Sequence, residues 1–422
     1  MDRRAWLVTL AAAALMALAS GLRASGGLFV SPLNSASGLG LATISLLFAT
    51  GQLALGLAQP VIGAWADRHG SARVVAGGAL VLALGTALLA LPGAGLAPGA
   101  ALAALAVALC AAAMANGAVG GNALLVGELN RRLPAAHAGV AVGVLSAGAS
   151  IGQLLVAPAT QALIETRGFV PAALASAALA LCALPLAAVL RRPAGSSDVA
   201  PAAPLGDALR DARFLRVAAS FGICGFHVSF LAVHMPGVIE RCGQDAALAG
   251  AWIAVAGVAN VAGSLAVGRA MPHVDIARLL AALYAVRAAG IAAFLCAAPS
   301  RTSLVALALV MGASHMATLP PTAQLVARQH GVARLSSLLG IVMLVHQVGG
   351  FGGIWLSGWL AERTGRDTPF WMVDIALALA AAALVWPLRA RRVSSQPAGC
   401  AASRRGVGEV QTSARTAADA NS

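Results

Sequence analysis

The chain contains 422 residues, of which 59% are hydrophobic and only 10% are charged. Its mean hydropathy of +0.84 lies far above that of soluble globular domains, so the composition excludes a soluble enzyme or binding module. The formal net charge of +13 comes from arginine alone, because the sequence contains no lysine. In a soluble protein such a charge would indicate nucleic-acid binding, so the placement of the arginines decides what it means.

A membrane-spanning helix needs about 20 apolar residues, and this chain is long enough for roughly twelve of them with short loops. Apolar runs bounded by glycine, proline and charged residues predict these spans. The first six are expected at residues 6–30, 40–65, 74–92, 100–126, 138–163 and 169–190. The second six are expected at residues 214–238, 247–269, 277–298, 303–326, 335–360 and 369–389. The sequence therefore predicts an all-α membrane protein.

A polar segment rich in proline, serine and arginine separates the two sets of spans. We expect a six-helix bundle over residues 1–190, a cytoplasmic linker over 191–213, a second six-helix bundle over 214–390 and a disordered cytoplasmic tail over 391–422. The two halves also resemble each other, since spans one and seven each end beside a proline, Pro32 and Pro236, before a glycine-rich span. Such a duplication predicts two pseudo-symmetric bundles that rock about a central site, as in transporters.

The arginines orient the predicted spans. With both chain termini in the cytoplasm, 21 of the 28 arginines lie inside, five lie outside, and only Arg23 and Arg287 lie within spans. By the positive-inside rule this bias fixes the orientation, and it explains the basic charge without nucleic acid. We expect a multi-pass protein of a bacterial inner membrane.

The N-terminus allows a second interpretation. Arg3 and Arg4 precede an apolar run that ends in small residues, which is also typical of a cleavable signal peptide. Cleavage would leave an odd number of spans and would remove the internal symmetry, which favours a first transmembrane helix.

The sequence does not show the residue patterns of several other chemistries. The six cysteines have no metal-ligand spacing, and five of them lie in or beside apolar runs, which predicts small core residues and no metal site. There is no P-loop, and no paired aspartates, HExxH motif or Ser/His pair at catalytic spacing. We expect no cofactor and no enzymatic activity, with a membrane-embedded enzyme or a sensor as a remote alternative.

The clearest motif joins spans two and three, from Gly56 to Arg73, with the sequence GLAQPVIGAWADRHGSAR. It resembles the cytoplasmic signature of the major facilitator superfamily, a glycine-rich helix end followed by Asp-Arg-x-Gly-x-Arg. The resemblance implies the twelve-helix fold of that family and a role for the motif in gating. Close helix packing at Gly56 and Gly63 and a short loop starting at Asp67 agree with it. The gating residues that the resemblance implies are Gly63, Asp67, Arg68, Gly70 and Arg73. Pro320 and Pro321 in span ten are added as gating candidates because they remove backbone donors within a span.

Further segments resemble the bacterial monocarboxylate-transporter-like branch of this superfamily, among them RASGGLFVSP at residues 23–32 and TLPPT at 318–322. Two departures from that branch bear on the substrate. Ser264 stands in span eight where carboxylate transporters of the branch usually carry a substrate-binding arginine, and the lysine that oxalate-type members use in span eleven is missing. A monocarboxylate substrate therefore follows from the resemblance and not from these residues.

Two intramembrane arginines are candidates for charge recognition. Arg23 lies in span one, which lines the central cavity in this superfamily, and a guanidinium in hydrocarbon is costly enough to need a reason. It is the first choice as an anion ligand, although it could instead snorkel to the outer surface. Arg287 lies in a peripheral span, where a structural partner is the better expectation, and Asp374 is one candidate partner.

Four histidines and several neutral groups complete the candidate substrate site. Histidine changes charge near neutral pH, which suits a proton-coupled carrier, although a lone membrane histidine is more often a packing residue. Amides and hydroxyls can bind substrate or join helices, and helix contact is the commoner role. Pro320 and Pro321 predict a kink with free carbonyls in span ten. The candidates besides Arg23 are Asn116, His227, His234, Asn260, His315, Thr318 and His346.

Taken together, the sequence predicts a secondary transporter that works by alternating access and moves a small organic anion such as a monocarboxylate. Its partners would be the substrate, protons and the lipid bilayer, and we expect a monomer that binds no nucleic acid. Transport would be proton-coupled or would work by exchange. Because intramembrane carboxylates are scarce, we expect coupling through histidine, through the charge of the substrate or by anion exchange in preference to a carboxylate relay. The alternative is efflux of a hydrophobic or cationic compound, which needs an acidic cavity that the sequence hardly offers.

Overall fold

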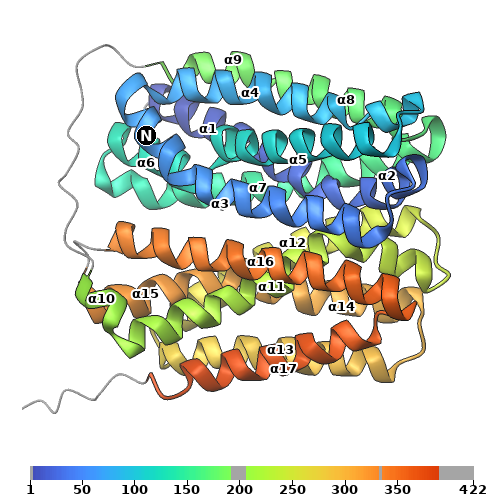
Figure 1. The fold of residues 1–422 in the computed structure, drawn as a ribbon. Coiled ribbons are helices and arrows are strands. Elements are labelled where there is room, and N and C mark those ends of the chain that lie inside the picture. The colour runs from blue at the N-terminus through green and yellow to red at the C-terminus, as the bar shows by residue number, and fades with distance from the viewer. Residues whose placement is uncertain (1–2, 192–205, 332–334, 389–422) are drawn as a thin grey trace, which may run out of the picture. The chain divides into compact units, whose positions relative to one another are not determined.

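The computed structural model describes residues 3–191, 206–331 and 335–388, and their regular structure is helical throughout (Figure 1). The first nine α-helices are α1 (Arg3–Ala24), α2 (Val30–Ser37), α3 (Leu41–His69), α4 (Ser71–Leu88), α5 (Pro98–Gly120), α6 (Asn122–Arg132), α7 (Ala135–Arg167), α8 (Phe169–Leu181) and α9 (Ala183–Val189). The rest are α10 (Gly206–Arg210), α11 (Ala212–Arg241), α12 (Ala247–Ala270), α13 (Ile276–Cys296), α14 (Arg301–Ser314), α15 (Leu319–His330), α16 (Leu335–Thr364) and α17 (Thr368–Val385). Short 3-10 segments η1 (Ser25–Phe29), η2 (Leu91–Ala94) and η3 (Met316–Thr318) join some of them.

These helices form twelve segments that are long and apolar enough to cross a membrane, which confirms the predicted number. Each overlaps one predicted span, from Arg3–Ser37, which joins α1, η1 and α2, to Thr368–Val385. The predicted tail at 391–422 and most of the predicted linker at 191–213 lie outside the described residues. Within the linker range, residues 206–210 form α10.

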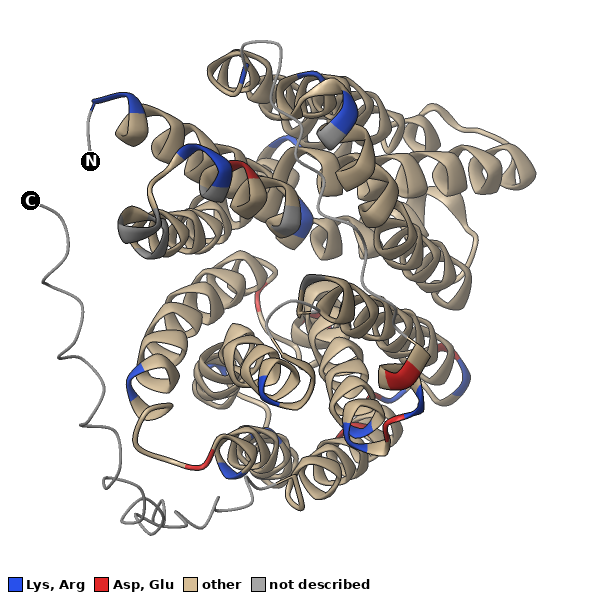
Figure 2. Ribbon diagram, turned by 90° about the vertical axis from the view of Figure 1, so that its left-hand side faces the viewer, with Lys and Arg blue, Asp and Glu red and all other residues tan. Residues whose placement is uncertain are grey.

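The helices lie in two groups, α1 to α9 and α10 to α17, which occupy the upper and lower halves of Figure 1. We call them the N-terminal and C-terminal groups. Successive spans run in opposite directions, so the bundle has two ends. We call the end at which α1 begins the α1 end, and Arg3, His69 and Arg132 lie there. We call the opposite end, at which Ser37 and Leu41 lie, the α2 end. Figure 2 looks onto the α1 end, with one group above the other.

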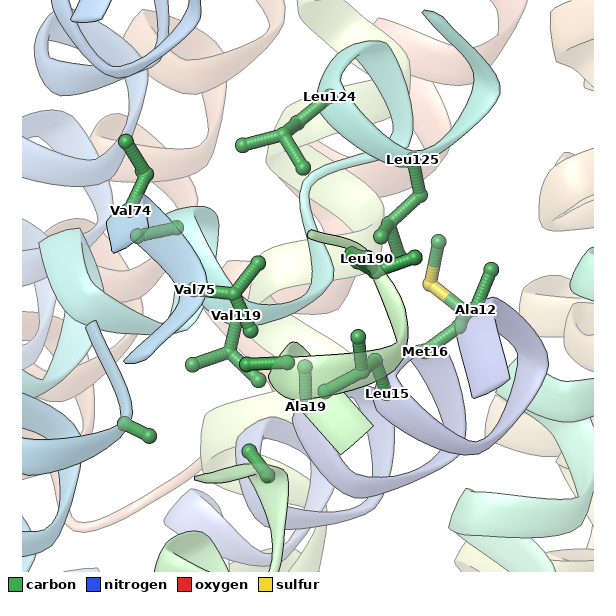
Figure 3. Packing of buried hydrophobic residues seen from close by; sticks show 14 of the residues in the cluster. Ala12, Leu15, Met16, Ala19, Val74, Val75, Val119, Leu124, Leu125 and Leu190 are labelled. Atoms are coloured by element: carbon green, nitrogen blue, oxygen red, sulfur yellow. The ribbon is translucent and has the colours of Figure 1, made fainter. Parts of the chain in front are cut away.

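Each group has its own apolar core at the α1 end. In the N-terminal group this core joins α1, α3, α4, α5, α6, α7, α8 and α9, and Figure 3 shows Leu15, Val75, Val119, Leu125 and Leu190 pointing toward one another. The corresponding core of the C-terminal group joins α10, α11, α13, α15, α16 and α17. Neither cluster contains a residue of the other group. The described cores therefore do not join the two groups at the α1 end.

The cores nearer the α2 end are shared between the groups. One cluster consists mainly of residues of the N-terminal group and also includes Val233 of α11 and Ile354 of α16. A second cluster consists mainly of residues of the C-terminal group and also includes Leu28 of η1 and Ala157 of α7. Burial of these apolar side chains favours association of the groups at this end. The protein is thus joined at the α2 end.

Small residues bring the main helix pairs close together, in the same way in both groups. A Cβ at Gly152 of α7 would clash with the backbone of Ala17 in α1, and one at Gly353 of α16 would clash with the backbone of Phe226 in α11. The first contact packs span five against span one, and the second packs span eleven against span seven. These are equivalent pairs of spans in the two halves. Small residues at such contacts allow the close approach on which membrane helix packing depends.

Candidate functional site

Span ten is broken in its middle, as its two prolines predicted. Helix α14 ends at Ser314, η3 follows, and Pro320 and Pro321 occupy the first turn of α15, where a missing N–H costs nothing. The break leaves backbone groups without their usual helical partners, and such groups need other partners inside a membrane.

Arg287 of α13 supplies several of those partners. Its Nε donates to Ser314 Oγ at 3.0 Å, its Nη2 donates to the carbonyls of Ser314 and His315, and its Nη1 lies 3.2 Å from Cys224 Sγ of α11. The side chain is 1% exposed and also lies over the Tyr284 ring. The expectation that Asp374 is a partner of Arg287 is wrong, because Asp374 contacts a histidine on α11 instead. Arg287 holds the broken span in place.

Three of the neutral candidates also have partners inside the protein. Asn260 of α12 accepts a hydrogen bond from the backbone N–H of Met316 at 3.0 Å, and Asn116 of α5 donates to the carbonyl of Ala19 in α1 at 2.8 Å. Thr318 donates to the His315 carbonyl at 3.0 Å and is 1% exposed. These contacts join helices or stabilise the break, and a substrate role for the three residues stays a prediction.

Arg23 lies in the last turn of α1, in the N-terminal group, and its side chain is exposed. Its charge acts on the His315 imidazole, as do the charges of Arg287 and His346. The structure thus brings together four of the residues that the sequence singled out, from α1, α13, the α14–η3 junction and α16. Both His315 and His346 are partly exposed, and four groups that carry or can carry positive charge meet here.

The other two candidate histidines lie deeper in the C-terminal group. His234 of α11 is 2% exposed, and its Nε2 lies 2.9 Å from the carbonyl of Ile354 in α16, so it joins these two helices. His227, two turns earlier on the same helix, is fully buried and its Nδ1 contacts Oδ1 of Asp374 in α17. Sequence reasoning named both histidines but missed this partner of His227.

The gating motif lies at the α1 end, and its geometry differs from expectation in two respects. Helix α3 continues to His69, so Asp67 lies within the helix and the loop before α4 consists of Gly70 alone, whose φ of 87° favours glycine. The Asp67 side chain lies outside the described part of the structure. A Cβ at Gly56 would come within 2.6 Å of Gln347, as close packing predicts, whereas one at Gly63 would meet nothing within 4 Å.

The arginines of the motif differ in their surroundings. Arg68 is exposed, while Nη1 of Arg73 reaches the carbonyl of His69 at 3.5 Å, near the end of α3. Ser71, the first residue of α4, donates to the buried Glu128 carboxylate of α6 at 2.7 Å, and Arg131 and Arg132 pair with the same carboxylate. This network, which the sequence did not reveal, fixes the motif to the N-terminal group.

Polar contacts join the two groups from the middle of the spans to the α2 end. Nε2 of Gln52 in α3 donates to Oε1 of Gln347 in α16 at 2.6 Å. At the α2 end, the Glu362 carboxylate of α16 accepts the backbone N–H of Ala42, in the first turn of α3, at 2.5 Å. At the α1 end a Cβ at Gly143, Gly268 or Gly340 would meet nothing within 4 Å. The described contacts thus show a conformation that is closed at the α2 end.

Comparison with known proteins agrees with this architecture. Residues 9–354 match the model of the Major Facilitator Superfamily, a range that includes most of α1. A crystal structure of a D-xylose-proton symporter has the same fold, with a TM-score of 0.67 over 91% of this chain and 97% of that chain at 14% identity.

Two curated relatives share more sequence over a shorter range. Monocarboxylate transporter 13 of Rattus norvegicus is 30% identical over 249 residues, which are 57% of this chain and 57% of the relative. Monocarboxylate transporter 13 of Bos taurus is 29% identical over 57% of this chain and 58% of the relative. The match thus spans somewhat more than half the length of these curated relatives. On the family match, the chain is a multi-pass membrane transporter and not an enzyme, and it belongs to the Major Facilitator Superfamily.

Proposed function

We propose that the protein moves a small organic anion, of the monocarboxylate class, across the membrane by alternating access, and that the anion binds at Arg23. The observation that carries this proposal is the position of the exposed Arg23 guanidinium of the N-terminal group within electrostatic range of His315 in the C-terminal group. A guanidinium offers a carboxylate two parallel N–H donors, so it both attracts and orients such an anion.

The charges around Arg23 favour an anion over a cation. The charged groups that act on His315 beside it are Arg287, whose donors are already engaged, and His346, which carries either a positive charge or none. In a medium of low dielectric these groups stabilise a negative charge and oppose a positive one. Efflux of a cationic compound would place that compound against three or four like-signed groups.

Ser264 of α12 bears on how a carboxylate would be held. It occupies the position where the branch that this sequence resembles carries an arginine, and it is partly exposed. Arg23 provides a guanidinium from α1 in place of that residue, so the anion would be held by the N-terminal group and not by the C-terminal one. The names of the two curated relatives support a monocarboxylate.

The closed α2 end and the arginine distribution indicate the conformational state. If the α1 end faces the cytoplasm, as the arginine bias predicts, the structure is the inward-facing state of a monomeric carrier in a bacterial inner membrane. Return to the outward-facing state requires the contacts at the α2 end, including Glu362 with Ala42, to separate.

Transport into proteoliposomes tests the proposal. The purified protein is reconstituted, and uptake and exchange of radiolabelled lactate, pyruvate and acetate are measured, with the cationic dye ethidium as the competing substrate class. We expect saturable exchange of at least one carboxylate, loss of that exchange in Arg23→Gln, and partial retention in Arg23→Lys, which keeps the charge. Movement of ethidium without movement of any carboxylate would contradict the proposed class.

A further inference from the structure

Asp374 is a carboxylate within its span, and it faces the interior of the C-terminal group. It is fully buried, six residues after the start of α17, and Oδ1 contacts Nδ1 of the equally buried His227. The remaining oxygen and the His227 Nε2 have no hydrogen-bond partner among the described residues. A buried carboxylate with so few partners is costly, and such a group in a membrane marks a functional site by default.

The groups that could compete for this pair are engaged elsewhere. The helices packed against α11 and α17 carry His346 on α16 and Arg287 and Tyr284 on α13, while α11 itself carries Cys224 and His234. Tyr284 donates its hydroxyl hydrogen to the Ser220 carbonyl, and His234 lies against the Ile354 carbonyl. The guanidinium of Arg287 is held by Ser314, His315 and Cys224. His346 acts on Cys224 and His315. Among the described residues, the ion-pair partner of His227 is Asp374.

An aromatic layer covers the pair on the side of the α2 end. Phe230 lies one turn beyond His227 on α11, and its ring packs against Phe370 and Trp371 at the start of α17, with centroid separations of 4.1 and 4.7 Å. Phe226 stacks on Phe370 at 5.2 Å. These rings are buried and seal the pair from the α2 end in this conformation.

We infer that the His227–Asp374 pair is the binding site for a proton that is transported together with the anion. This inference rests on the proposed function, and it separates two roles: Arg23 on α1 binds the anion, and the pair between α11 and α17 binds the proton. The loaded pair holds one proton and is neutral overall. When that proton leaves for solvent, a neutral imidazole and a carboxylate remain, with a net charge of −1.

The charges of the two sites explain why anion and proton would move together. With both bound, Arg23 is neutralised by the anion and the pair is neutral, and with neither bound the charge of Arg23 balances that of the unloaded pair. With only one bound, the interior carries a net charge of +1 or −1. A bound anion adds a negative charge that favours the proton on the pair, and a bound proton in turn favours the anion, whatever charge Arg287 adds to every state. The two ligands therefore bind cooperatively in a low-dielectric interior.

Infrared difference spectroscopy of the purified protein tests the proton site without any substrate. As pH is varied, the wild type should show imidazole and carboxylate bands that change together and that vanish in Asp374→Asn. His227→Gln should replace them with the C=O stretch of a protonated carboxyl group. His234→Gln, a matched change of a buried histidine on the same helix, should leave the bands of the pair unchanged. Bands that persist in Asp374→Asn would overturn the inference.

Transport of radiolabelled lactate tests the coupling. Asp374→Asn and His227→Gln should keep lactate exchange within about threefold of the wild type, while accumulation driven by an inward proton gradient falls by about tenfold or more. Exchange shows in the same vesicles that the variant is folded. Equal loss of exchange and accumulation in both variants, or unchanged accumulation in both, would overturn the inference.

The two proposals fail in different ways. Wild-type vesicles that neither exchange nor accumulate lactate, pyruvate or acetate would contradict the proposed substrate class, and the infrared titration would still decide whether the pair binds a proton. If both single variants are too unstable to purify, the double variant His227→Leu with Asp374→Leu keeps the site apolar. Its spectrum subtracted from that of the wild type should then contain the bands of the pair, and their absence would overturn the inference.

Discussion

Gln52 of α3 donates a hydrogen bond to Gln347 of α16 at 2.6 Å, and this bond joins the N-terminal and C-terminal groups near the middle of the membrane spans. Gly56, one turn further along α3, packs against the same Gln347 side chain. The contact exists only while the groups are close at this depth. Any conformation that opens at the α2 end must lengthen or break it.

We expect Gln52→Ala to shift the population toward the state that is open at the α2 end. Loss of a hydrogen bond with a net value of about 1 kcal/mol changes the ratio of the two states by roughly fivefold. Pulsed electron paramagnetic resonance between spin labels at Ser35 and Arg366, both exposed at the α2 end, should show a larger fraction of long distances. Thr50→Val, whose hydroxyl bonds only within α3, is the matched control and should not change the distances.

Substitution of Glu362 should also shift the population toward the state that is open at the α2 end, but by a smaller amount. Its carboxylate accepts the Ala42 N–H at the N-terminus of α3, where the helix dipole favours negative charge. Because Glu362 is exposed, solvent screens the interaction, and we expect Glu362→Gln to weaken closure by only about 0.5 kcal/mol. The same spin labels measure the effect, which high salt should reduce. Glu240→Gln, at the same end and also exposed, serves as the control, and an equal shift in both variants would contradict the account.

Arg287 should be a stability residue. Arg287→Ala leaves the carbonyls of Ser314 and His315 without their donor, and each buried group left unpaired costs about 1–3 kcal/mol. We expect a clear fall in the thermal unfolding temperature, followed by the fluorescence of the seven tryptophans. Arg287→Lys should recover part of it, and the exposed Arg301→Lys should not alter it. Wild-type stability of Arg287→Ala would show that the broken span does not depend on this side chain.

Cys242 follows the last residue of its span and should react slowly with thiol reagents. Burial and the nearby Asp367 carboxylate raise the pKa of the Cys242 thiol, so less thiolate is present at pH 8 than in a free cysteine. We expect its alkylation rate to keep rising above pH 8. Asp367→Asn removes the negative charge and frees Arg241 from its ion pair, and both changes lower the pKa and speed the reaction. Mass spectrometry of the Cys242 peptide measures the rate, and slower alkylation in the variant would contradict this assignment.

The fold was predictable from the sequence because its main determinant is local. About 20 apolar residues form a span wherever they occur, and glycine, proline and charge mark its ends, so all twelve spans were found. The break in span ten was also predictable, since Pro320 and Pro321 lack the N–H groups that a continuous helix needs. The single-residue loop at Gly70 was not predictable, because the polar residues before it can either form a loop or extend the helix beyond the membrane.

The partners within the site were less predictable, because they depend on which helix faces meet. Composition placed Arg287 and Asp374 within spans, but only packing shows that α13 turns its arginine toward the break and that α17 turns its aspartate toward α11. For the same reason Asn116 and Asn260 could not be assigned to helix contacts beforehand. Arg23 could be singled out as a candidate, since an arginine inside a span needs polar partners or a ligand, and its role as an anion ligand stays a prediction.

Equilibrium binding of carboxylates to the purified protein tests the central claim most directly, because it isolates Arg23 from transport and coupling. Thermal unfolding is measured with a library of small carboxylates at two pH values, for the wild type, Arg23→Gln and Arg23→Lys. The account predicts that at least one monocarboxylate stabilises the wild type, that Arg23→Gln abolishes the shift, and that Arg23→Lys retains part of it. A carboxylate that stabilises Arg23→Gln as much as the wild type would show that the anion binds elsewhere.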